Sequence, residues 1–159
     1  MEQRPHILVD ADACPVKDEI YRVAFRLRIA VTLVSNAHLR VPQDPLIKRI
    51  VVGQGFDAAD DWIAAQANGS TLVVTADILL ADRCLKAGAA VIAPNGKPFT
   101  ANSIGNAIAV RAIMNDLRAG GDRIGGPPPF GKDDRSRFLS SLDAALTAAL
   151  RKPPGTPLF

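Results

Sequence analysis

The sequence predicts an α/β domain of three layers, with a central, mostly parallel sheet of about five strands and helices at the C-terminal end. Short apolar segments rich in branched side chains alternate with segments of helical periodicity over residues 1–98. Helices of this length between strands form right-handed crossovers, which place the strands parallel in one sheet. A chain of 159 residues, 48% of them hydrophobic, is long enough for a single domain with its own core.

Five segments have the length and composition of strands. The first is almost wholly apolar until it ends in an acid, as expected of a strand that is buried on both faces. The others are rich in β-branched residues and are bounded by polar or turn-forming residues. The expected strands are His6–Asp10, Ala30–Ser35, Arg49–Gly53, Thr71–Thr75 and Ala90–Ala93.

Helices are expected between these strands and after the last one. Pro15 suits a first helical position, where its missing N–H is needed by no partner. Asp57 and Asp77 suit N-cap positions, and Gly69 and Gly88 follow the expected helix ends. The expected helical ranges are 15–27, 57 to 66 or 67, 77–87, 100–119 and 134–150.

The domain therefore has an α/β core over residues 1–98 and a helical part over residues 99–150. Residues 120–132 contain Gly-Gly-Pro-Pro-Pro and are expected to form a loop, whose role the sequence does not indicate, and the tail 151–159 is expected to fray. No apolar run approaches the roughly 20 residues that a membrane span requires. Two cysteines are too few for a disulfide framework, and the chain begins without a signal-like segment, so a cytoplasmic location is expected. The sequence predicts no oligomeric state.

Aspartates are concentrated where strands are expected to end. Asp10, Asp12 and Asp77 directly follow strands, and Asp57 and Asp60 begin a helix. Ligands of parallel sheets bind beyond the carboxyl ends of the strands, so folding should gather these carboxylates. Such a cluster is costly unless a cation neutralises it. Ligands that are all oxygen favour Mg²⁺ or Mn²⁺.

The same acids also have structural interpretations. Asp57 and Asp77 could simply cap helices, and Asp60 could complete a reciprocal cap. The pair Asp10 and Asp12 is better explained by function, because a cap needs only one acid and both would point to the same side of a strand. Cys14 also lies nearer to the capping position before Pro15, and we expect it to be an inert, buried thiol.

Weaker candidates surround this cluster. Ser35 and Asn36 end a strand and could reach the site, although turn formation is their more common role. Arg111 and Arg135 flank the proline-rich loop and could bind phosphate, or could belong to a solvated face. A net charge of +3 and a pI near 9.1 are compatible with RNA as a partner but do not indicate one.

Several motifs together resemble the YaiI/YqxD family of uncharacterised bacterial proteins, whose fold looks like a PIN-type nuclease domain. The resemblance spans nearly the whole chain. Its motifs are Val9-Asp-Ala-Asp-Ala-Cys-Pro-Val-Lys17, Ser35-Asn36 with Arg40, Asp57-Ala-Ala-Asp60, Val74-Thr-Ala-Asp77 with Leu80-Ala81, and Gly125-Gly-Pro127 with Asp134-Arg135 and Phe138.

The resemblance implies a PIN-like domain whose metal site would contain Asp10, Asp60 and Asp77. Asp12 would join these as a further ligand and catalytic residue. Asp61 and Asp82 match no acid of the family pattern and are expected to be surface or capping residues. The residues of second rank near the site are Asp57, Ser35, Asn36, Arg40 and Lys17.

Three functions remain open on the sequence. The first is a divalent-metal-dependent phosphodiesterase, similar to a ribonuclease, in which one or two ions activate water. The second is a haloacid-dehalogenase-like phosphatase with Asp10 as nucleophile and Asp12 as acid. The third is a non-catalytic module that binds nucleic acid or protein, although 5% aromatic residues argue against a stacking platform for single strands.

Overall fold

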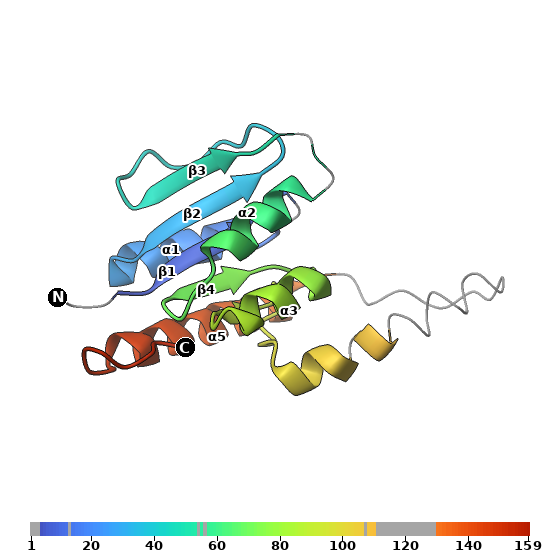
Figure 1. Ribbon diagram of the computed structural model, residues 1–159. Helices are drawn as coiled ribbons and strands as arrows, with labels where there is room; N and C mark the ends of the chain where they lie inside the picture. Colours follow the sequence, from blue (N-terminus) through green and yellow to red (C-terminus); the bar gives the residue numbers. More distant parts are fainter. Residues whose placement is uncertain (1–3, 13, 54, 56, 107, 111–129) are drawn as a thin grey trace.

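A five-stranded parallel sheet lies between two layers of helices (Figure 1). The structure is a computed structural model, and it describes residues 4–12, 14–53, 55, 57–106, 108–110 and 130–159. All four strand pairings are parallel, and the strand order is β3-β2-β1-β4-β5. The predicted α/β class with a central parallel sheet is confirmed. The strands are β1 (His6–Asp10), β2 (Ala30–Ser35), β3 (Ile47–Val51), β4 (Thr71–Val74) and β5 (Ala90–Ile92).

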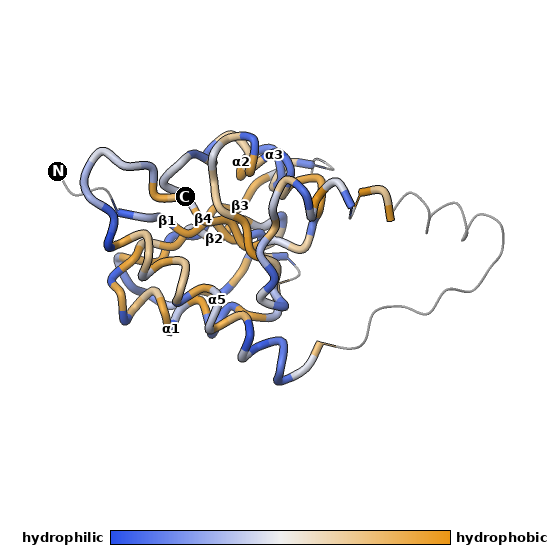
Figure 2. Tube along the Cα trace, turned by 90° about the horizontal axis from the view of Figure 1, so that it is seen from below, coloured by the Kyte–Doolittle hydropathy of each residue, from blue (hydrophilic) through white to orange (hydrophobic). Residues whose placement is uncertain are grey.

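The central strand β1 supplies side chains to two hydrophobic cores. Ile7 and Val9 belong to one core and Leu8 to the other, as the alternation of side chains along a strand requires. Helices α1 (Lys17–Leu27) and α5 (Lys132–Leu150) cover the first face. Helices α2 (Ala58–Gln66) and α3 (Ile78–Lys86) cover the second. Figure 2 shows the apolar strands between these two helical layers.

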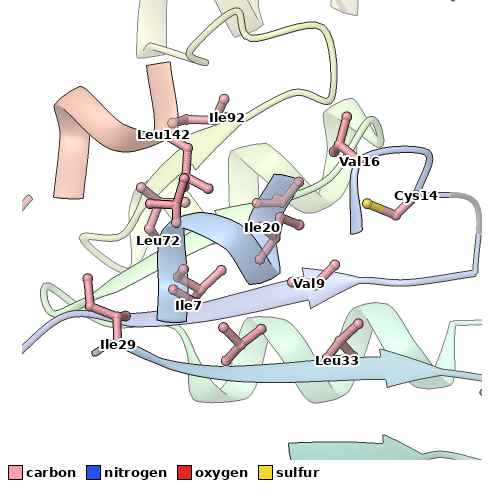
Figure 3. Close-up of a cluster of buried hydrophobic side chains, with 14 of the residues drawn as sticks. Ile7, Val9, Cys14, Val16, Ile20, Ile29, Leu33, Leu72, Ile92 and Leu142 are labelled. Carbon is pink, nitrogen blue, oxygen red and sulfur yellow. The ribbon is translucent and has the colours of Figure 1, made fainter. Parts of the chain in front are cut away.

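The core under α1 and α5 reaches the carboxyl end of β1. This core contains Leu142 of α5, Ile20 of α1 and Leu72 of β4, and it also includes Cys14 and Val16 from the segment after β1. Figure 3 shows these side chains around Ile7, and shows Cys14 beyond the carboxyl end of β1. Burial of this core stabilises the segment that follows β1, which is where the candidate site begins.

The strand order creates a switch point between β1 and β4. From β1 the chain proceeds outward to β2 and β3, and it then returns to the other side of β1 to form β4 and β5. At such a point the connections leave the sheet in opposite directions, which opens a crevice beyond the carboxyl ends of the strands. In Figure 1 these ends lie at the right, where α2 and α3 begin.

Several predicted boundaries are wrong by about two residues, and β3 ends at Val51 rather than Gly53. β3 starts at Ile47 rather than Arg49, because Val31 N–H donates to Leu46 O (2.8 Å) and begins the pairing with β2 earlier. α1 starts at Lys17 rather than Pro15, with Val16 as N-cap. Cys14 therefore does not occupy the capping position that its place before Pro15 suggested.

The C-terminal part differs from prediction at both ends. Residues 101–106 and 108–110 are helical, whereas residues 111–119 and most of the predicted loop 120–132 lie outside the described residues. α5 begins earlier than predicted, and Asp134 Oδ2 accepts a hydrogen bond from Gly131 N–H (3.0 Å) at its start. The tail does not fray, because Leu158 is buried and Lys152 Nζ donates to its carbonyl oxygen (2.7 Å).

A membrane span was not expected, and among the described helices none has both the length and the apolar character to cross a bilayer.

The turn after β5 packs closely against the backbone of α5. Gly96 has φ +88°, and a Cβ at this position would lie 2.6 Å from the carbonyl carbon of Arg137. Ser141 Oγ donates to Gly96 O (2.7 Å). The absence of a side chain at Gly96 thus allows α5 to pack beside the carboxyl end of β5.

Substitution Gly96→Ala should lower the free energy of unfolding by about 3 kcal/mol or more, since it adds a backbone clash to the roughly 1–2 kcal/mol cost of a left-handed conformation. The control Gly155→Ala has a similar φ of +84° and no atom within 4 Å, and should show the conformational cost alone. Urea titrations of both variants measure the difference. Equal losses would contradict the packing role of Gly96.

Candidate functional site at the carboxyl ends of the strands

Two of the predicted acids flank the switch point and are linked by one threonine. Asp10 is the last residue of β1, and Asp77 is the N-cap of α3 just beyond β4. Thr75 Oγ1 donates to Asp10 Oδ2 (2.9 Å) and accepts a hydrogen bond from Asp77 N–H (3.0 Å). Thr75 is buried. Its hydroxyl therefore fixes the Asp10 carboxylate relative to the backbone that carries Asp77.

The Asp10 carboxyl is in an environment that disfavours its charge. Burial raises its pKa, the hydrogen bond from Thr75 lowers it, and the nearby carboxylates of Asp12 and Asp77 raise it again. The net direction is upward from its ordinary value. A carboxylate in this position is stabilised by any cation that approaches it.

Asp60 brings a further carboxylate from the first turn of α2. Burial raises its pKa to about 6, with smaller upward contributions from Asp77, Asp10 and Asp57 and a downward one from Arg83. Asp60 and Asp10 are 50 positions apart in sequence, yet each lies within electrostatic reach of the other and of Asp77. This electrostatic coupling agrees with the predicted convergence of acids from separate elements, which stays a prediction.

These acids do not form a ready-made metal cage. Within the described residues, no group of three or more His, Cys, Asp or Glu side chains is placed to hold a metal ion. The donors nevertheless suit Mg²⁺ or Mn²⁺ in kind, because they are hard oxygen atoms with uncompensated negative charge. Mg²⁺ also commonly keeps several waters and uses only one or two protein carboxylates. The assignment of ligands stays a prediction.

Asp12 is held differently from the way its spacing suggested. β1 ends at Asp10, so the alternation of a strand does not orient Asp12. Asn36 N–H donates to both carboxylate oxygens of Asp12, at 3.1 and 2.9 Å. Asp12 thereby ties the segment after β1 to the end of β2. Ser35 is buried and its Oγ donates to Ala37 O (2.6 Å), which is the turn-forming role.

The predicted N-cap positions of Asp57 and Asp77 are confirmed, but only Asp77 caps its helix through its side chain. Asp77 Oδ1 accepts from Leu79 N–H (2.9 Å) and Leu80 N–H (3.2 Å). Asp57 occupies the N-cap position of α2 without a capping hydrogen bond to its side chain. The cap uses only one carboxylate oxygen of Asp77, so capping and metal binding are compatible there.

The predicted basic residues have separate environments. Lys17 Nζ donates to Ala11 O (3.4 Å), beside the site. Arg40 is exposed, and Arg111 lies outside the part of the chain that the structure describes. Arg135 Nη1 donates to Pro15 O (2.6 Å) and contacts Glu19 Oε1 at 3.4 Å. Phosphate binding by Arg111 and Arg135 stays a prediction.

Residues given minor roles by the sequence behave as expected. Asp61 forms an ion pair with Arg83 (2.9 Å), and Asp82 pairs with Lys86 (2.8 Å). Cys14 is buried, and burial raises the pKa of its thiol, as expected of an inert cysteine.

Thr75 is the functional candidate that sequence reasoning missed. Thr75 stands in the Val74-Thr-Ala-Asp77 motif, and that motif by itself indicates no role for it. The available signal was its place at the end of a predicted strand, next to the strand that carries Asp10.

Comparison with known proteins places most of the chain in one family. Residues 8–148 match a family described as uncharacterised, the YaiI/YqxD family. A UPF0178 protein of Sphingopyxis alaskensis is 70% identical over 148 residues, which cover 92% of this chain and 96% of that relative. Another from Bradyrhizobium diazoefficiens is 61% identical over 146 residues, or 92% and 87% of the two chains. No solved structure matches, so the likeness to PIN domains is untested.

The raised pKa of Asp60 makes stability depend on pH. Between about pH 4 and pH 6 the native state holds a proton that the unfolded state has lost, so the free energy of unfolding should fall as pH rises through this window. The substitution Asp60→Asn removes this decrease in the free energy of unfolding. In EDTA at pH 7.5 the variant should be more stable than wild type by about 1 kcal/mol or less, because solvent screens this partly exposed group.

Urea titrations at pH 4.5 and pH 7.5 test this expectation. Asp82→Asn is the matched control, since it removes an acid paired with Lys86 on the surface and should change stability little at either pH. The expectation would be contradicted if the wild-type free energy of unfolding rose from pH 4.5 to pH 7.5 and Asp60→Asn had the same stability as wild type at both pH values.

Proposed function

This chain belongs to the YaiI/YqxD family, whose description assigns no activity, and we propose that it is a divalent-metal-dependent phosphodiesterase that cleaves RNA. The observation that carries the proposal is the link of Asp10 through Thr75 to the backbone of Asp77 at the switch point of a parallel sheet, with Asp60 coupled electrostatically to both acids. Ligands of such sheets bind at this position.

Each acid has a distinct part in the proposed site. Asp10 would hold Mg²⁺ or Mn²⁺ through a carboxylate that Thr75 orients. Asp60 would approach from α2, and Asp77 would contribute the oxygen that its helix cap leaves free. Asp12 would support the site by fixing the turn after β1, or would join the ligands through the remaining lone pairs of its carboxylate. The bound ion would supply an activated water and neutralise charge on the phosphate.

The choice of RNA rests on the resemblance to PIN-type nucleases and on charge. The net charge of +3 is compatible with a polyanionic substrate. Arg111 and Arg135 would contact phosphates, Arg135 with the guanidinium donors that Pro15 and Glu19 do not use. Lys17 and Arg40 would add positive charge along the approach.

The hydrogen bonds of Asp12 argue against the phosphatase alternative. As general acid it would have to donate a proton to the leaving group, but both of its carboxylate oxygens accept hydrogen bonds from Asn36 N–H. Trapping of a fluoroberyllate adduct on Asp10 would favour this alternative. The non-catalytic alternative would be favoured by RNA binding that survives both EDTA and Asp10→Asn, without turnover.

Mn²⁺ titration followed by calorimetry, together with cleavage of a labelled single-stranded RNA, tests the proposal. Wild type should bind Mn²⁺ and cleave RNA only when Mg²⁺ or Mn²⁺ is present. Loss of a residue that only supports a metal ligand lowers activity roughly 10- to 100-fold. Asp10→Asn should lower the cleavage rate by more than this. Asp82→Asn should retain binding and cleavage, because Asp82 is paired with Lys86 outside the cluster.

The absence of both Mn²⁺ binding and cleavage, over a panel of single-stranded and structured RNAs, would contradict the proposal. Cleavage that persists in EDTA or in Asp10→Asn would contradict the metal site specifically.

A further inference from the structure

A mostly apolar pocket of about 420 Å³ opens beside the acidic cluster. Ala76 and Ile78, the residues on either side of Asp77, contribute to its wall. Pro15, from the segment after β1, lines another part. The pocket therefore adjoins the acids through the two segments that carry Asp77 and Asp12.

Two aromatic side chains from different parts of the chain also line this pocket. Phe99 follows the turn after β5, and Phe130 lies just before α5. Phe130 is 37% exposed, although a large apolar side chain is normally buried more completely. The Arg135 guanidinium lies over the Phe130 ring, 5.1 Å from its centroid.

Arg135 connects the aromatic wall to the segment after β1. Its Nη1 donates to Pro15 O (2.6 Å), so the same guanidinium contacts two lining residues from distant parts of the chain, Pro15 and Phe130. This contact favours the present position of the partly exposed ring. An exposed aromatic face next to a cavity is suited to stacking against a planar ring.

Asn95 adds one polar group to the lining. Its Oδ1 accepts from Lys97 N–H (3.0 Å), which restrains the side chain and leaves its amide NH2 group for other partners. The amide NH2 group can donate hydrogen bonds to an acceptor on a ligand ring. The pocket volume lies in the lower part of the range of about 300–1,000 Å³ that is usual for small-molecule sites.

We propose that this pocket binds one nucleobase of the RNA substrate and thereby places the neighbouring phosphate at Asp10, Asp60 and Asp77. The inference rests on the proposed function for the identity of the substrate. Phe130 would stack on the base, Phe99 would line the other aromatic wall, and Asn95 would donate to a ring acceptor. Stacking dominates in such a site, so purines and pyrimidines would both bind.

Saturation-transfer NMR with adenosine, uridine and methyl ribofuranoside tests the pocket directly. The measurement is made in EDTA, where no turnover occurs, and uncharged nucleosides avoid repulsion by the acids. Both nucleosides should receive saturation at their base protons, and methyl ribofuranoside should not bind. Phe130→Ala should weaken nucleoside binding by about fivefold or more, as expected for the loss of one stacked base. Phe130→Trp should retain it.

Phe25→Ala is the matched control. Phe25 has a similar exposed fraction of 38%, but it stacks on Tyr21 of α1 and does not line the pocket. This variant should bind nucleosides as wild type does. Circular dichroism of both alanine variants checks that each is folded.

The possible outcomes separate the pocket from the metal site. Nucleosides that bind no better than methyl ribofuranoside, or equally well to Phe130→Ala, would overturn the pocket even if metal-dependent cleavage is observed. Nucleoside binding that depends on Phe130 in a protein that cleaves no RNA would support the pocket and count against the phosphodiesterase.

Discussion

Mutual repulsion among the carboxylates of Asp10, Asp60 and Asp77 is the constraint on which this site depends. The parallel sheet fixes Asp10 at the end of its central strand, and the helix cap fixes Asp77 beside it. Thr75 stabilises this arrangement through hydrogen bonds to Asp10 and from Asp77 N–H but does not remove the charge. The fold therefore holds like charges near one another at the edge of the sheet where α/β proteins bind ligands, and a divalent cation is the simplest group that would make this arrangement favourable.

The hydrophobic cores position these acids from both sides of the sheet. Leu8 is buried against α2 and α3. This packing fixes α2, which carries Asp60, and α3, which begins directly after Asp77. Burial of Ile7 and Val9 with α1 and α5 fixes the opposite face. Because α5 packs against the turn at Gly96, its first residues lie near the carboxyl ends of the strands. The proposed metal site and the pocket lined by Phe99 and Phe130 consequently share one edge of the molecule.

Much of this arrangement could be predicted from sequence, because short apolar strands that end in acids carry a local signal. That signal located Asp10, Asp77 and the parallel sheet. It could not give the hydrogen bonds of Asp12 or Thr75, since these connect β1 to β2 and to β4 in a strand order that sequence alone did not determine. The packing of the C-terminal tail depends likewise on distant contacts, such as that of Phe159 N–H with Gly69 O (3.3 Å).

The most direct measurement is a crystal structure of the protein soaked in Mn²⁺, with the ion located by its anomalous scattering. The account predicts Mn²⁺ at the switch point, in contact with Asp10 and at least one of Asp60 and Asp77, with water completing its coordination. A map with no ion among these three carboxylates at millimolar Mn²⁺, or with the ion bound only elsewhere on the surface, would contradict it.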